Sequence, residues 1–265
     1  MPYSFDDLTH AYETLGVRQG GLVYVTSHLL GVADYEERGS RALIDAHYRA
    51  LRKCLGEEGT LVVATASTDL CNTDTIFDVN QTLGMESGAF SEYVRTRAGT
   101  HRSFHPFVSY TAEGPMAQAL TSNTSRYCYG PETPEGRMVE HDALHLSVGL
   151  PPKKTCSTVH HVEQIMAVPY RYTKEFIHPV RRNNTVSDEP FYMHVWYRDI
   201  ELERDSNAKL FTELNKNMTI NQAQIGRGII YSYSMQDFVT YACRAFAADP
   251  YVWCKTPPKI RPYQK

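Results

Sequence analysis

Apolar positions in the first quarter of the chain switch between helical spacing and continuous runs. A capping box at residues 4–7 precedes apolar residues three and four positions apart, which predicts a helix that ends at Gly16. Continuous apolar runs predict buried strands over residues 22–27 and 59–65, and the pattern between them predicts a helix over residues 40–54. Because a strand, a helix and a strand in this order form a crossover unit, we expect the two strands to be parallel and covered by helices.

The carboxyl ends of these strands are the expected walls of a binding site, since ligands of parallel sheets bind beyond those ends. They lie at residues 26–28 and 65–69. The long polar loop that follows the second strand carries Asp69, Asp74 and Asp78. A loop of this length is often functional, and its carboxylates would suit a cationic or amine-bearing substrate. Solvated loop charge is the alternative explanation.

The rest of the chain continues as a mixture of helices and strands. Helices are predicted over residues 88–97, 209–217 and 236–247, and strands over residues 107–111, 144–148, 191–197 and 226–232. A charged segment at residues 198–205 follows the alternating, antiparallel-type strand. Because no repeat or linker divides the chain, residues 1–265 are predicted to form a single domain, with residues 173–225 as a candidate elaboration on the acceptor side.

Composition and charge restrict the class of protein. Hydrophobic residues make up 42% of the chain and charged residues 22%, which indicates a folded protein rather than a disordered one. The net charge of −3 leaves no basic surface for nucleic acid. The N-terminus lacks the layout of a signal peptide and no apolar run reaches membrane-spanning length, so we expect no membrane association. The sequence is compatible with a monomer or a homo-oligomer.

Cysteine and histidine patterns give no sign of a metal site. The six cysteines are scattered without a C-x-x-C pair, which favours reduced thiols in the cytoplasm over a disulfide framework or a zinc site. The 11 histidines form no H-E-x-x-H motif. We therefore predict a cytoplasmic protein without a bound metal.

The segment over residues 155–163 is the strongest candidate for catalysis. Ser157 is expected to cap a helix, which places His160 in its first turn, where the helix dipole favours a neutral imidazole. Glu163 lies three residues further along and can orient the ring from the same helix face. A neutral, oriented imidazole close to the Thr155 and Ser157 hydroxyls suits removal of a proton from a nucleophile.

Three other interpretations of this segment remain open. His160 could be a surface or capping residue, and the adjacent His161 points about 100° away around the helix and offers a second imidazole. Cys156 could form a nucleophile and base pair with His160, as in thiol acyltransferases and hydrolases. Cys156 could equally be a buried, inert thiol.

Taken in order from about residue 5 to residue 172, several segments resemble the aminoglycoside 3-N-acetyltransferase family. The matches are a strand-end turn at residues 26–29, a Gly-Thr-Leu-Val strand at residues 59–65, a long block at residues 88–109, a Gly-Pro turn at residues 130–134 and the histidine motif at residues 157–163. The chain departs from the family pattern at Thr26 and His28 of the turn, and its segment 150–154 is one residue longer.

The resemblance implies a three-layer α/β/α fold with a mixed central sheet, distinct from the GNAT fold. It also implies transfer of an acetyl group from acetyl-CoA to an amine of an amino sugar. The acceptor would be an aminoglycoside, which would confer antibiotic resistance, or a nucleotide- or glycan-linked amino sugar. The residues that it assigns to the coenzyme are Ser27, His28, Arg102, Ser103 and His105.

Our mechanistic hypothesis is direct transfer, in which His160 deprotonates the attacking amine while Glu163 orients its ring. Thr155, Ser157 or a backbone N–H at the helix start would stabilise the oxyanion. The alternatives are a Cys156–His160 acyltransferase or hydrolase, and a catalytically silent protein that binds CoA or a sugar.

Overall fold

A mixed β-sheet forms the centre of the computed structural model, which describes residues 2–198, 200, 202–203 and 209–259. In this described part of the chain, seven strands pair in the order β4-β5-β2-β1-β6-β10-β9. Their bounds are Thr100–Arg102 (β4), Tyr110–Glu113 (β5), Thr60–Ala64 (β2), Leu22–Ser27 (β1), Leu144–Val148 (β6), Gly228–Ser234 (β10) and Asn221–Ile225 (β9). Strands β2, β1 and β6 are parallel, whereas the outer strands pair antiparallel on both sides.

Helices cover both faces of this sheet. Successive side chains of β1 point to opposite faces, and the apolar ones pack against helices on each side. Val23 and Val25 pack with residues of α1 (Phe5–Thr14), α2 (Ser40–Leu55) and α3 (Ala89–Arg95). Tyr24 points to the other face, which is covered by α4 (Ala117–Thr121) and α5 (Pro134–Glu140). Beyond β6, α7 (Thr158–Ile165) packs against α9 (Met235–Ala248), and α8 (Lys209–Asn217) packs on the same helix. The predicted three-layer fold with a mixed sheet is confirmed.

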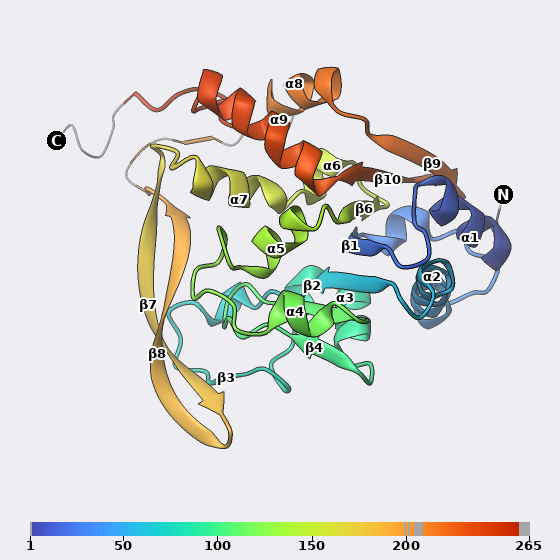
Figure 1. The fold of residues 1–265 in the computed structure, drawn as a ribbon, viewed down its shortest axis with the longest axis horizontal. Helices are drawn as coiled ribbons and strands as arrows, with labels where there is room; N and C mark the ends of the chain where they lie inside the picture. The colour runs from blue at the N-terminus through green and yellow to red at the C-terminus, as the bar shows by residue number, and fades with distance from the viewer. Residues whose placement is uncertain (1, 199, 201, 204–208, 260–265) are drawn as a thin grey trace.

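A long hairpin stands beside the central sheet, at the left of Figure 1. Its strands β7 (Arg171–Arg182) and β8 (Thr185–Trp196) pair along their whole length, and the short β3 (Phe77–Asp78) joins them as a third strand. Asn183 and Asn184 form its tip with φ angles of 45° and 67°. Asparagine tolerates this left-handed conformation better than most residues, which suits a tight two-residue turn.

Short elements connect these layers around the carboxyl ends of the parallel strands. They are the single turns η1 (Leu29–Val32), η2 (Thr68–Leu70), η3 (Met85–Ser87) and α6 (Pro152–Thr155). No helix among the described residues is both long enough and apolar enough to span a bilayer.

Most of the predicted elements occur, with two informative differences. Strands β1 and β2 are parallel as expected. The strand predicted from residue 107 begins only at Tyr110, because the backbone N–H groups of Phe107 and Val108 donate to His105 Nδ1 in a turn. The strand predicted over residues 191–197 is the end of β8, whose partner β7 was not predicted. Much of the charged segment 198–205 lies outside the described residues.

Candidate active site

Two adjoining cavities meet at His160, near the carboxyl ends of β1 and β2. The first, which we call the sheet-end cavity, measures about 520 Å³ and is lined by the strand ends and by the segment from Lys153 to His160. The second, the hairpin cavity, measures about 720 Å³ and is lined mainly by the end of β8 and the residues after it. The residues that line both cavities are Thr68, Val108, Tyr129 and His160.

His160, Glu163 and Arg171 form one hydrogen-bonded cluster at this junction. His160 Nδ1 lies 2.7 Å from Glu163 Oε2, with both residues on α7. The Arg171 guanidinium, at the start of β7, approaches the same carboxylate oxygen at 2.9 Å. Tyr170 donates its hydroxyl to the other oxygen, Oε1, at 2.8 Å. The carboxylate is buried, while the imidazole keeps 23% of its surface exposed.

This environment keeps Glu163 ionised. Burial opposes the charge, but it is outweighed by the hydrogen bond from His160, the charge of that ring when it is protonated, the charge of Arg171 and the Tyr170 hydroxyl. Together they lower the pKa of Glu163 to about 2. An ionised Glu163 accepts a hydrogen bond from Nδ1–H of the ring. That tautomer leaves the lone pair on Nε2, which is the arrangement a general base requires.

Ser157 precedes α7, but its hydroxyl does not cap the helix, which corrects the sequence-based expectation. The residue has helical backbone angles, because α6 runs into α7 with little interruption. Its Oγ instead lies 2.9 Å from the Tyr24 hydroxyl. The Thr155 hydroxyl pairs with that of Ser147 on β6. The Ser157 and Thr155 side chains line the sheet-end cavity, and each hydroxyl is hydrogen-bonded to a residue of the central sheet.

A buried carboxyl group beneath this cavity was not recognised from the sequence. Glu135 on α5 is fully buried and accepts hydrogen bonds from Tyr110 and, at 2.7 Å, from Thr158. Burial raises the pKa of Glu135. The sequence predicts a Gly-Pro turn over residues 130–134, and Glu135 lies just beyond it. The sequence does contain a signal for the start of α5, because Thr133 is a typical N-cap residue and accepts a hydrogen bond from the backbone N–H of Gly136.

A family model and several relatives match this chain over most of its length. The model described as "Aminoglycoside 3-N-acetyltransferase" matches residues 25–247. The chain belongs to this family. It is 26% identical to aminoglycoside N(3)-acetyltransferase VII of Streptomyces paromomycinus, covering 85% of this chain and 80% of the relative.

Solved structures confirm the fold of the family. Aminoglycoside acetyltransferase AAC(3)-Xa superposes with a TM-score of 0.80 at 20% identity, covering 96% of this chain and 95% of that one. AAC-IIIb, solved as a binary complex with CoASH, gives a TM-score of 0.78 at 19% identity, covering 97% and 100%.

The turn after β1 lies beside two cavities. Ser27 and His28 line a third cavity, the β1–η1 cavity, which measures about 480 Å³. Ser27 also lines the sheet-end cavity, so the two cavities adjoin at the end of β1.

The other three predicted coenzyme residues are engaged with the protein itself. Arg102 donates to the carbonyl oxygens of Thr65 and Thr82. Ser103 Oγ accepts from the backbone N–H of Tyr110 at 2.9 Å, and His105 accepts the two backbone N–H groups described above. These contacts stabilise the loops next to the sheet-end cavity, and none of the three side chains lines that cavity.

The predicted substrate aspartates do not gather at one place. Asp69 follows Thr68, which lines both cavities, and its backbone N–H donates to Glu86 at 2.7 Å. Asp74 lies exposed further along the loop. Asp78 lies 3.4 Å from Arg181 and lines a separate cavity at the hairpin tip. Of the three, Asp69 stays the candidate for acceptor binding.

The competing nucleophile and base are both buried. Burial raises the pKa of Cys156 to about 12, which disfavours the thiolate that an acyl-cysteine route needs. The His161 ring is also buried, accepts from the backbone N–H of Gly130 at 3.3 Å and has its pKa lowered to about 4 by burial. It fixes the Gly-Pro turn of the family.

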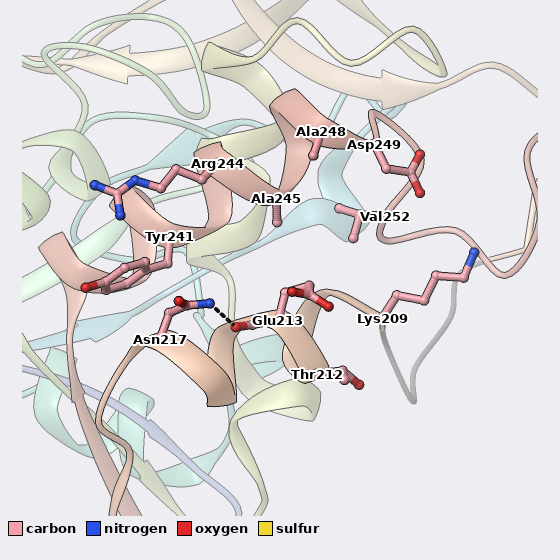
Figure 2. Close-up of a pocket in the computed structure, with 10 residues that line it drawn as sticks. All are labelled: Lys209, Thr212, Glu213, Asn217, Tyr241, Arg244, Ala245, Ala248, Asp249 and Val252. Carbon is pink, nitrogen blue, oxygen red and sulfur yellow. Dashed lines mark hydrogen bonds between the residues drawn. The ribbon is translucent and has the colours of Figure 1, made fainter.

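Neither a metal site nor a further cavity extends the candidate site among the described residues. No group of three or more His, Cys, Asp or Glu side chains in this part of the chain is arranged to hold a metal ion. A cavity of about 580 Å³ between α8 and α9 is lined by both cations and carboxylates, among them Lys209, Glu213 and Asp249 (Figure 2). None of the predicted site residues lines it.

Proposed function

We propose that this protein is an acetyl-CoA-dependent N-acetyltransferase that acetylates an amine of an amino sugar by direct transfer. The observation that carries the proposal is the position of His160: it lies where two cavities meet, with Nδ1 bonded to an ionised carboxylate. Membership of the aminoglycoside 3-N-acetyltransferase family supports the reaction class, and the CoASH complex of AAC-IIIb supports the acyl donor.

The coenzyme would occupy the β1–η1 and sheet-end cavities, which adjoin at Ser27. Apolar side chains such as Leu29 and Leu43 line the first cavity and suit the aliphatic and ring portions of CoA. Arg38 and Lys154 line the two cavities and complement its phosphate charge. Ser27 and His28 are the proposed coenzyme contacts.

The acceptor would occupy the hairpin cavity. Tyr129, Trp196 and Tyr197 give this cavity aromatic walls, which suit the apolar faces of sugar rings. Trp196 ends β8, which supports the expectation that residues 173–225 contribute to the acceptor side. The acceptor class includes aminoglycosides, on which the named relatives act, and amino sugars linked to a nucleotide or glycan.

In the proposed reaction, His160 Nε2 takes a proton from the amine as its nitrogen attacks the thioester carbonyl. The carbon–nitrogen bond forms, the tetrahedral intermediate collapses, and the carbon–sulfur bond breaks to release CoA. Ser157, Thr155 or a backbone N–H at the start of α7 stabilises the oxyanion, which for a single donor is typically about 3 kcal/mol. General-base action adds roughly 10²–10⁴ in rate. The six cysteines are free thiols, which supports a reducing, cytoplasmic setting.

A CoA-release assay over a panel of amino sugars tests the function, with calorimetry of acetyl-CoA binding as the companion measurement. His160→Ala should abolish turnover and leave coenzyme binding nearly intact, whereas His141→Ala, at an exposed position, should behave as wild type. Coenzyme binding without turnover on any acceptor would indicate the silent binding protein instead. Full turnover by His160→Ala would reject the mechanism.

A further inference from the structure

Arg171 contacts both members of the proposed catalytic pair. Its Nη2 atom lies 2.9 Å from Glu163 Oε2 and 3.2 Å from His160 Nδ1. Its other terminal nitrogen, Nη1, donates to the carbonyl of His194 at 2.8 Å, and its guanidinium lies over the ring of Trp196 at 5.1 Å. The side chain is 8% exposed, so these partners hold it in one position.

His160 Nδ1 can either donate a hydrogen bond to Glu163 or accept one from Arg171, but it cannot do both at once. If Nδ1 carries the proton, it donates to Glu163 and Nε2 is the base. If Nδ1 lacks the proton, it accepts from Arg171, and Nε2–H cannot accept the proton of an amine. The 2.7 Å contact with Glu163 is the shorter of the two, which favours the first state. In that state Arg171 bonds to Glu163 and remains beside the ring.

The charge of Arg171 then acts on the imidazolium that forms during the reaction. A like charge about 3 Å from the ring disfavours its protonated form. Four other titratable side chains near the pair in the described part of the chain, His194, Cys254, Tyr129 and Tyr170, are held in their neutral forms near pH 7. Burial lowers the pKa of His194 to about 4 and raises that of Cys254 to about 12, and it also raises the pKa values of Tyr129 and Tyr170. Arg198 lines the exposed rim of the hairpin cavity.

We propose that Arg171 is a positioning residue that sets the acid–base balance of His160. It fixes the Glu163 carboxylate, and its charge makes the imidazolium acidic enough to return the proton to the departing CoA thiolate. The proton that Nε2 takes from the amine therefore leaves on sulfur as the thiol, and His160 is neutral again for the next cycle. This inference rests on the proposed function.

Kinetics as a function of pH distinguish this role from a structural one. Arg171→Gln should move the acid limb of kcat/KM upward by about one pH unit, because the imidazole then holds its proton more firmly. Its kcat should fall while KM for acetyl-CoA changes little. Arg171→Lys, which keeps the charge, should leave the limb near its wild-type position. Arg95→Gln is the matched control, because it breaks the similarly buried Arg95–Glu92 pair on α3.

A second pair of variants covers the case in which Arg171→Gln does not fold, since it leaves a buried carboxylate unpaired. Glu163→Gln is compared with the double variant Glu163→Gln, Arg171→Gln, and the acid limb of the double variant should lie about one pH unit higher. The role of Arg171 would be overturned if the acid limb lay at the same pH in Arg171→Gln and wild type, and at the same pH in the double variant and Glu163→Gln. It would also be overturned if Arg95→Gln shifted the limb as far as Arg171→Gln does. The proposed function is tested separately, because full activity of His160→Ala would reject its mechanism whatever the behaviour of the Arg171 variants.

Discussion

The hydroxyl groups of Tyr24 and Ser157 lie 2.9 Å apart, although 133 positions separate these residues in the chain. Tyr24 belongs to the central strand β1, and Ser157 immediately precedes the helix that carries His160. The contact therefore ties the start of α7 to the middle of the sheet. It also fixes the direction in which the Ser157 oxygen faces the sheet-end cavity.

Removing either hydroxyl should weaken catalysis by different amounts. Ser157→Ala removes a candidate oxyanion donor, for which losses of about 10²–10³ in kcat are typical. Tyr24→Phe keeps the ring packing and should lower kcat less, because Ser157 remains but is less well oriented. Steady-state kinetics with a fixed acceptor measure both effects. Wild-type kcat in Ser157→Ala would assign oxyanion stabilisation to Thr155 or to the backbone.

Glu163 should make stability depend on pH at the acidic end. Its pKa is lowered from 4.5 to about 2 in the folded protein, so its contribution is fully present above pH 4.5 and is lost as the pH falls toward 2. The shift corresponds to roughly 3 kcal/mol. Urea unfolding of wild type and Glu163→Gln should therefore differ at pH 7 and converge as the pH falls toward 2. A constant difference across this interval would assign the effect to packing.

Cys156→Ser should retain the activity of the wild type. A buried thiol with a pKa of about 12 carries almost no thiolate near pH 7, so its loss should cost stability rather than turnover. Mass spectrometry after mixing with acetyl-CoA is the direct check. An acetyl group found on the protein in wild type and absent in Cys156→Ser would restore the acyl-cysteine route.

Arg102 should matter for stability and little for the coenzyme. Its guanidinium donates to the carbonyls of Thr65 and Thr82, and charge-assisted bonds of this kind contribute about 1.5–3 kcal/mol each. Arg102→Ala should thus lower the free energy of unfolding by a few kcal/mol. Calorimetry should give a Kd for CoA close to that of wild type. A tenfold weaker Kd in a folded variant would reinstate Arg102 as a coenzyme contact.

The periodicity of the sequence predicted β1 and β2 because the middle of each strand is an apolar run that is buried on both faces. It failed for β7, in which the apolar Ile177 is exposed while the polar Lys174 and His178 are more buried, so that hydropathy does not follow the burial of the strand. That strand is defined by pairing with β8, a long-range property that local spacing does not encode.

The candidate site was predictable to the extent that it lies within one segment. His160 and Glu163 are three residues apart on a helix, and their contact follows from helical geometry. Arg171 and Glu135 come from β7 and α5, and only the tertiary fold brings them to α7. Ser157 looked like a cap because serine is common there, but its hydroxyl bonds to Tyr24 instead.

The meeting of the sheet-end and hairpin cavities at His160 has a consequence for the order of events. Since each cavity has its own lining beyond the shared wall, the proposed function assigns donor and acceptor to separate spaces that can be filled at the same time. We therefore expect catalysis through a ternary complex, and double-reciprocal plots at several fixed acceptor concentrations should intersect rather than run parallel.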